Sequence, residues 1–292
     1  MPLTDDIRAA CARVAARARR VRIVEEAIAP YAAALPAGSP PAPDLPGASD
    51  EQRAAFQLTL NAINFGSGWF PTLRKRPGMS GFRTVEAGLR AHGPWTAEQL
   101  AGIDREEIAA ALGQDSEHEL MGLFETALRE LGERVGGPFL PFVRAHGSAE
   151  PLAEHLAAWP TWADVSPYDG DAVPFFKRAQ IAADLALADL IDGRDLYRLT
   201  IFADNLVPHV LRLDGVLAFD DDLVARIEAE ELIEHDSPEE VEIRACALHA
   251  VERLVAAHGA TTAAAVDNVL WHRGAAARYK ARPRHRARST AY

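Results

Sequence analysis

Ser237-Pro238-Glu239-Glu240 is the clearest start of a helix in the sequence. Serine is a favoured cap, proline is accepted at the first helical position, and glutamate at the third position completes a capping box. Apolar residues then recur at spacings of four, three, three and four, at Val241, Ala245, Leu248, Val251 and Val255. This spacing predicts a long helix with one apolar face.

Similar helical patterns extend over most of the chain, at 5–35 with a break at Pro30, and at 49–64, 85–92, 96–103, 105–112, 117–135, 174–192 and 262–271. Five prolines between positions 36 and 46 exclude a helix there. The glycine- and proline-rich segment 64–81 predicts a long ordered loop, a kind of loop that is often functional. Strand alternation never exceeds a few residues. We therefore predict an all-α fold, in a chain long enough for one large domain or two small ones.

The composition is that of an ordinary globular protein, with 48% hydrophobic and 25% charged residues. The two cysteines, Cys11 and Cys246, lie too far apart in sequence to form a metal cluster, and a chain of 292 residues needs no disulfide. The N-terminus lacks a basic flank followed by an apolar run, and no apolar stretch reaches 18 residues. We therefore expect a soluble, cytoplasmic protein with no membrane span.

The charge is unevenly distributed along the chain. The formal net charge is −11, yet the last twenty residues carry seven Lys and Arg and no acid. The acidic body repels nucleic acid in bulk. The basic tail indicates either a local anion site or a segment that docks on its own protein.

Asp204 is the first candidate for chemistry. It lies in the apolar stretch 199–208, and Pro208 has no N–H to donate to the Asp204 carbonyl, so a helix is expected to begin near Asp204 or Asn205. A carboxylate at that position is most simply a helix cap. The alternative is a catalytic carboxylate that faces a cleft.

Two further groups have a structural and a functional interpretation. Lys177, Gln180 and Asp184 form a polar stripe on a mostly apolar helix, either as an internal ion network or as part of a site, because buried charges must be paired or functional. Asp267 and Asn268 are suited to bind a planar base on which Trp271 stacks, unless they form an ordinary helix end with a core tryptophan.

Other motifs argue against metals and cofactors. His235-Asp236 precedes the helix start without partner histidines at helical spacing, and no Glu-x-x-His, Gly-x-Gly-x-x-Gly or Walker loop occurs. Glu240 and Arg244 have the spacing of an ordinary surface ion pair. We expect neither a metal nor an organic cofactor.

The second half of the chain resembles the queuosine salvage family. The resemblance is carried, in order, by Pro174-Phe175-Phe176-Lys177-Arg178-Ala179-Gln180, Leu199-Thr200-Ile201-Phe202-Ala203-Asp204, Val207-Pro208 and Glu240-Val241-Glu242-Ile243-Arg244-Ala245-Cys246. Asp267 with Leu270-Trp271, and the closing His285-Arg286-x-Arg288-x-x-x-Tyr292, resemble the C-terminal blocks of the family. The resemblance is specific from about residue 170 to the end and less typical over residues 1–80.

The resemblance implies a single large helical domain over residues 1–292, with a fold like that of helical DNA glycosylases. It also implies hydrolysis of queuosine 5'-phosphate to queuine and ribose 5-phosphate, in salvage of queuine for tRNA modification. It gives Asp204 the catalytic role, as covalent nucleophile or as base for water. It implies that Phe202, Asp267, Asn268, Trp271 and His272 bind the base, with Asn268 and His272 differing from the residue types expected. Lys177 and a tail arginine, Arg282, Arg286 or Arg288, are candidates for the phosphate.

Two alternatives remain beside this interpretation. Where the family commonly has an aromatic-rich Cys-Phe-Trp, this chain has Gly66-Ser67-Gly68-Trp69-Phe70, so a related N-glycosidase acting on another nucleoside monophosphate is one alternative. The other is a non-catalytic binder of RNA or of a modified nucleotide through the basic tail. No Leu-Pro-Gly-x-Gly hairpin lies between the predicted helices, so direct action on nucleic acid is not expected. The partner expected is a small nucleotide, and the sequence does not determine the oligomeric state.

Overall fold

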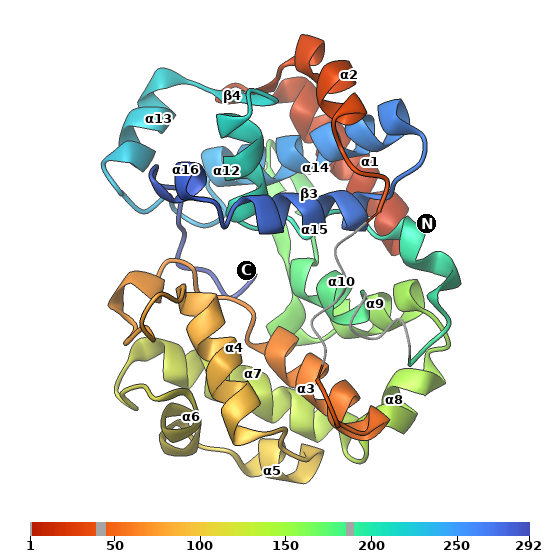
Figure 1. The fold of residues 1–292 in the computed structure, drawn as a ribbon, viewed down its shortest axis with the longest axis vertical. Helices are drawn as coiled ribbons and strands as arrows, with labels where there is room; N and C mark the ends of the chain where they lie inside the picture. The colour runs from red at the N-terminus through yellow and green to blue at the C-terminus, as the bar shows by residue number, and fades with distance from the viewer. Residues whose placement is uncertain (1, 39–44, 185–189) are drawn as a thin grey trace. The chain divides into compact units, whose positions relative to one another are not determined.

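The computed structural model describes residues 2–38, 45–184 and 190–292. Helices make up most of these residues, and the strands among them form short two-stranded sheets (Figure 1). The predicted helical fold is therefore confirmed. The chain divides into two compact units, which are described separately. Unit 1 comprises Met1–Pro41, Asp164–Lys177 and Leu196–Arg288, and unit 2 comprises Ala42–Ala163, Arg178–Asp195 and Ser289–Tyr292.

Unit 1 is built around α14 (Pro238–His258), the helix predicted from its start at Ser237. The Ser237 hydroxyl accepts a hydrogen bond from the backbone nitrogen of Glu240, as the capping pattern predicts. Every residue from 240 to 248 is buried, so the first half of α14 is enclosed on all sides, whereas the spacing predicted one apolar face.

Several helices of unit 1 surround α14. The helices that pack against it are α1 (Leu3–Arg17), α2 (Glu25–Ala33), α12 (Leu206–Leu213) and α15 (Ala263–Arg273). α13 (Asp221–Glu228) and α16 (Ala277–Lys280) also belong to this unit (Figure 1). One buried cluster of aliphatic and aromatic side chains joins these helices. Burial of such apolar surface is the main stabilising contribution to a fold of this kind.

Two small antiparallel sheets complete unit 1. β1 (Val21–Ile23) pairs with β4 (Leu217–Phe219), with Val21 opposite Phe219. β2 (Val165–Tyr168) pairs with β3 (Asp171–Pro174) as a hairpin. The strands are too short to give a sequence alternation that would identify them.

The helix predicted to start at Pro174 begins later. Pro174 ends β3, and α10 (Lys177–Ala183) starts three residues further on. Phe176 has a φ of 48°, which interrupts a right-handed helix, so the earlier start was wrong. The part of the predicted helix at 185–189, with Leu185 and Leu187, lies outside the described residues.

Unit 2 is built around α7 (Glu119–Val135). α3 (Asp50–Ala62), α5 (Ala97–Gly102) and α6 (Arg105–Leu112) pack against α7. The unit also contains α4 (Gly81–His92), α8 (Phe139–Ala145), α9 (Ala149–Ala157) and the 3₁₀ turns η1 (Phe70–Thr72) and η2 (Pro160–Trp162), while η3 (Gly193–Arg198) contributes residues to both units. Over the described residues, no helix has the length and apolar composition needed to cross a membrane.

Side chains cap several helix starts in unit 2. Ser49 and Thr96 form capping boxes with Gln52 and Gln99. The helix predicted at 117–135 begins at Glu119 and is capped by His118, whose Nδ1 accepts from the backbone nitrogen of Leu120 at 3.2 Å. The predicted start of this helix was therefore two residues too early.

The predicted loop at 64–81 consists of turns around η1 and leads into α4. A Cβ atom at Gly81 would lie 2.4 Å from Cγ of Phe70, so only glycine allows this approach. Within the same segment, Trp69 donates from Nε1 to Glu119 at 2.7 Å. The altered segment 66–70 is thus held to the start of α7.

Candidate active site

Asp204 lies in unit 1, two residues before the start of α12 at Leu206. Its Oδ1 accepts hydrogen bonds from the backbone nitrogens of Leu206 at 2.7 Å and Val207 at 3.3 Å. The third residue of α12 is Pro208, which has no N–H to be capped. The predicted helix start near Asp204 or Asn205 is therefore confirmed. Asn205 occupies the N-cap position, and the carboxylate of Asp204 binds the first two N–H groups of α12.

The second oxygen of this carboxylate has a different environment. Asp204 is partly exposed, and Oδ2 accepts no hydrogen bond from the described residues. The helix therefore holds one carboxylate oxygen in place and leaves the other available for a substrate. Capping and catalysis, which the sequence presents as alternatives, are compatible in this geometry.

Phe202 and Asp267, which the family resemblance assigns to one base site, lie in contact. Both are buried, and Oδ1 of Asp267 accepts a hydrogen bond from the backbone nitrogen of Phe202 at 2.9 Å. Asp267 reaches this position from α15. The contact fixes the chain two residues before Asp204.

A buried ion pair supports the same segment from α14. The Nη1 and Nη2 atoms of Arg244 donate to the Asp164 carboxylate at 2.9 and 2.7 Å. Its Nε donates to the carbonyl oxygen of Ala203 at 2.9 Å. The guanidinium also lies 3.9 Å from the centre of the Phe175 ring, within the range of a cation–π contact.

The expectation of a surface pair at Glu240 and Arg244 is wrong. Both side chains are 0% exposed, and Nη1 of Arg244 lies 3.6 Å from Oε1 of Glu240. An i, i+4 pair of opposite charges is usually solvated, which is why the spacing was misleading. The apolar residues on every side of it, among them Val241, Ile243 and Ala247, are the sequence signal that would have indicated burial.

The predicted tail arginines mostly have acidic partners. Arg282 donates to Glu228 at 2.9 Å, and Arg286 pairs with Glu230 at 2.9 Å. Arg288 is exposed. The first two pairs agree with a tail that docks on its own protein, one of the two explanations given for its charge.

Arg284 is the tail residue that the sequence analysis missed. It is partly buried, and it makes no hydrogen bond or ion pair with the residues that the structure describes. Asn205 donates from Nδ2 to the carbonyl oxygen of His285 at 3.1 Å. Asn205 follows Asp204 and His285 follows Arg284 in the chain, so this bond joins the two segments. Burial lowers the pKa of Arg284, whereas the charge of the nearby Asp204 raises it.

Two buried histidines lie beside this segment. Burial lowers the pKa of His209 to about 4 and that of His285 to about 3. His209 contacts the carbonyl oxygen of Tyr279 through Nε2 at 2.9 Å. Both rings are therefore neutral at pH 7.

Lys177 and Gln180 of α10 and Asp184, which directly follows this helix, are all buried. The backbone nitrogen of Lys177 donates to Oδ2 of Asp164 at 3.0 Å. Asp164 therefore bonds both Arg244 and the first residue of α10, which connects the Lys177 segment with the support of Asp204.

The other base-binding candidates, Asn268, Trp271 and His272, also lie on α15. Asn268 donates from Nδ2 to the carbonyl oxygen of Ala264 at 3.1 Å, and Nδ1 of His272 lies 2.7 Å from the carbonyl oxygen of Asn268. Trp271 is partly exposed, and its ring centre lies 5.1 Å from that of His272. Asn268 and His272 thus contact their own helix.

A possible set of metal ligands occurs at the start of α14. Ligand atoms of His235, Asp236 and Glu240 lie within 4.8 Å of one another. Although burial lowers it, contact with Glu240 and Asp236 raises the pKa of His235 overall. Glu240 also lies beside the Arg244 guanidinium, with 3.6 Å between Oε1 and Nη1.

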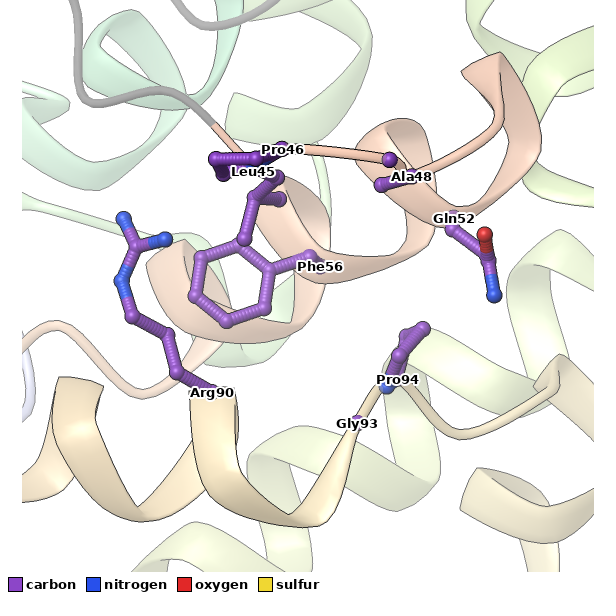
Figure 2. A pocket seen from close by; sticks show the side chains of 9 residues that line it. Leu45, Pro46, Ala48, Gln52, Phe56, Arg90, Gly93 and Pro94 are labelled. Carbon is purple, nitrogen blue, oxygen red and sulfur yellow. The ribbon is translucent and has the colours of Figure 1, made fainter.

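Figure 2 shows a separate pocket of about 280 Å³ in unit 2, lined by Phe56 of α3, Arg90 of α4 and the segment 45–48. The Arg90 guanidinium lies 4.9 Å from the centre of the Phe56 ring and pairs with Glu86 at 3.0 Å. None of the predicted site residues lines this pocket.

Comparisons with known proteins identify one family over most of the chain. The profile of the family described as queuosine salvage protein matches residues 45–292. The chain is 37% identical over 265 residues to the queuosine 5'-phosphate N-glycosylase/hydrolase of Sphaerobacter thermophilus, which covers 83% of this chain and 82% of that protein. It is 32% identical to the protein of the same name from Mus musculus, over 53% of this chain and 47% of the relative. The relative of that name from Dictyostelium discoideum is 30% identical over 67% and 65%.

Proposed function

The chain belongs to the queuosine salvage protein family, and we propose that it hydrolyses the N-glycosidic bond of queuosine 5'-phosphate. Water adds across the bond, and the products are queuine and ribose 5-phosphate. The observation that supports this proposal most directly is the geometry of Asp204, with Oδ1 held by the start of α12 and Oδ2 available.

Asp204 supplies the chemistry of bond cleavage. Loss of the base leaves positive charge on the ribose ring, in a transition state like an oxocarbenium ion. A carboxylate oxygen beside the anomeric carbon stabilises this charge, and either attacks the carbon or takes a proton from water. The base has carbon in place of the purine N7, so protonation at N7 cannot assist its departure. The carboxylate therefore carries more of the catalysis.

Asp267 and Phe202 hold the base. The guanine-like edge of the substrate offers an N–H and an exocyclic amine, which a carboxylate accepts in a charge-assisted pair. Asp267 is buried, so this contact is shielded from water, and Phe202 packs on the base. Asn268, Trp271 and His272 form the rest of the proposed base site.

Arg284 is the best candidate for the 5'-phosphate among the tail arginines. Arg282 and Arg286 already pair with Glu228 and Glu230, whereas Arg284 has no such partner among the described residues. Its proximity to Asp204 suits a ligand whose phosphate is one carbon from the ribose ring. Lys177 contributes a second cation in this proposal. A phosphate supplies the anion that a partly buried guanidinium requires.

The variant Asp204→Asn tests the catalytic role. Its amide oxygen still accepts the two backbone bonds of α12, so the fold is retained, whereas the nucleophile or base is lost. We expect release of queuine from queuosine 5'-phosphate to fall at least about a thousandfold. Asp220→Asn is the matched control, because Asp220 caps α13 with the same kind of bond. Equal turnover in Asp204→Asn and the wild type would disprove the assignment.

A panel of nucleoside 5'-monophosphates tests the substrate. Mass spectrometry of the liberated bases shows queuine alone if the proposal is correct. Release of another base would favour an N-glycosidase with a different substrate. Binding of nucleotide or RNA without release of any base, weakened steeply by salt, would favour a non-catalytic binder.

A further inference from the structure

We propose that Arg244 is a positioning residue for the hydrolysis, which fixes the peptide group of Asp204 and, through Asp164, the turn at residues 175–177. The inference rests on the proposed function, in which the Asp204 carboxylate acts at the sugar. Arg244 touches neither substrate nor reacting atoms in this proposal and acts through the backbone.

The segment around Asp204 depends on side chains from other elements. Residues 201–204 form neither helix nor strand, so their buried polar groups need partners from elsewhere. Asp267 accepts from the nitrogen of Phe202, and Nε of Arg244 donates to the carbonyl of Ala203, each at 2.9 Å. The Ala203 carbonyl belongs to the peptide group that includes the nitrogen of Asp204. The two bonds therefore fix the backbone immediately before the catalytic carboxylate.

The Arg244 guanidinium can bind the Ala203 carbonyl and the Asp164 carboxylate together because it has several donors in one plane. Two of its nitrogens bind Asp164 at 2.9 and 2.7 Å while Nε binds Ala203. The side chains of Arg244 and Asp164 are 0% and 2% exposed, so neither exchanges its partner for water. Lysine has a single nitrogen and cannot reproduce this geometry.

Asp164 extends the same support to a strained turn. Its carbonyl oxygen accepts from the nitrogen of Phe175 at 2.9 Å, and its carboxylate accepts from the nitrogen of Lys177 at 3.0 Å. Between them, Phe176 has a left-handed φ of 48°, which a phenylalanine adopts only when its surroundings hold it. One ion pair thus sets the backbone of both Asp204 and Lys177.

The variant Arg244→Lys in the full-length protein tests the inference. It keeps the charge opposite Asp164 but loses the donor to Ala203. We expect kcat for queuosine 5'-phosphate, per folded molecule, to fall about 10- to 100-fold, with KM changed by no more than about threefold. A role in stability alone would reduce the folded fraction without this change in kcat.

Glu242→Gln is the matched control. Glu242 lies two residues before Arg244 on α14 and is equally buried. Its Oε2 accepts from the backbone nitrogens of Arg19, Arg20 and Val21 at 3.0, 2.6 and 3.0 Å. The variant should lower the melting temperature but leave kcat within about twofold of the wild type.

Hydrogen exchange distinguishes a residue that positions the Asp204 segment from one that only stabilises the fold. Arg244→Lys should accelerate amide exchange at residues 202–207 and leave residues 19–23 unchanged. Glu242→Gln should do the reverse, because its bonds go to the start of β1. Exchange of the amide of Leu206 reports directly on the carboxylate of Asp204, which accepts its hydrogen bond.

The outcomes distinguish this inference from the proposed function. Absence of base release by the wild type would refute the proposed function, and with it the premise of the inference. An active wild type with unchanged kcat or unchanged exchange at 202–207 in Arg244→Lys would overturn the inference alone. If that variant does not fold, Asp164→Asn replaces it, with kcat expected to fall about tenfold. Unchanged kcat in Asp164→Asn would likewise overturn the inference.

Discussion

The carboxylate of Asp267 accepts a hydrogen bond from the backbone nitrogen of Phe202 at 2.9 Å, across 65 residues of sequence. This bond joins α15 to the segment that carries Asp204. Both residues belong to the proposed base site. In the proposed function, Asp267 both holds this segment and recognises the base.

Asp267→Asn separates these two functions. The amide oxygen still accepts from Phe202, but the negative charge that pairs with the base is lost. We expect kcat/KM to fall about 10- to 100-fold, which corresponds to the energy of a charge-assisted pair, with little change in melting temperature. Steady-state kinetics and thermal unfolding of the same preparation measure both effects. Wild-type kcat/KM in this variant would exclude Asp267 from base recognition.

Asp204→Ala should destabilise the protein more than Asp204→Asn. Alanine cannot accept the hydrogen bonds from Leu206 and Val207, and loss of a cap costs about 1 kcal/mol. Asparagine retains the acceptor. Urea unfolding of the two variants measures the difference, while both should lack turnover. Equal stability would show that the bonds to α12 contribute nothing to folding.

Arg284→Ala should weaken binding of the phosphorylated substrate. Because the guanidinium pairs with the phosphate in this proposal, we expect KM for queuosine 5'-phosphate to rise at least about tenfold. Arg282→Ala is the control, since Arg282 is exposed and already pairs with Glu228, and a surface pair contributes little. The comparison uses KM for the 5'-phosphate and for the nucleoside. An equal rise in KM for both substrates would show that Arg284 does not recognise the phosphate.

Stability should fall as the pH is lowered from about 6.5 to 5. Burial lowers the pKa of His209 to about 4 and that of His285 to about 3, whereas both return to about 6.5 on unfolding. The unfolded chain therefore binds more protons in this window, and protonation favours unfolding. The folded protein retains this advantage above pH 6.5.

His209→Gln should flatten this pH dependence. Glutamine can still donate to the carbonyl of Tyr279 but does not titrate. Free energies of unfolding from urea titrations at pH 7, 6 and 5 give the slope for each protein. A slope as steep in the variant as in the wild type would assign the effect to other groups.

The sequence was sufficient for the helical class and for the start of α14, because capping residues and apolar spacing act locally. It also placed the start of α12 through Pro208, which cannot donate a backbone hydrogen bond. Phe202 and Asp267 were assigned to one site through the family resemblance, and the structure brings them into contact. The roles of the site residues remain predictions.

Long-range contacts account for what the sequence did not show. Arg244 looked like half of a surface pair, since its spacing from Glu240 does not reveal that α14 is enclosed on every side. In the sequence, Arg284 resembles the neighbouring tail arginines. The structure distinguishes them, because Arg282 and Arg286 pair with Glu228 and Glu230. The start of α10 was misplaced because the left-handed turn at Phe176 has no glycine to mark it.

The first turn of α12 has no spare backbone donor. Two of its N–H groups are bonded to Asp204, and the third residue is Pro208. Helix starts often bind anions through such N–H groups, but the N–H groups of this helix start already bind the carboxylate of Asp204. An anionic ligand beside Asp204 must therefore be recognised by side chains, and affinity for it can be altered by replacing those side chains without rebuilding the helix.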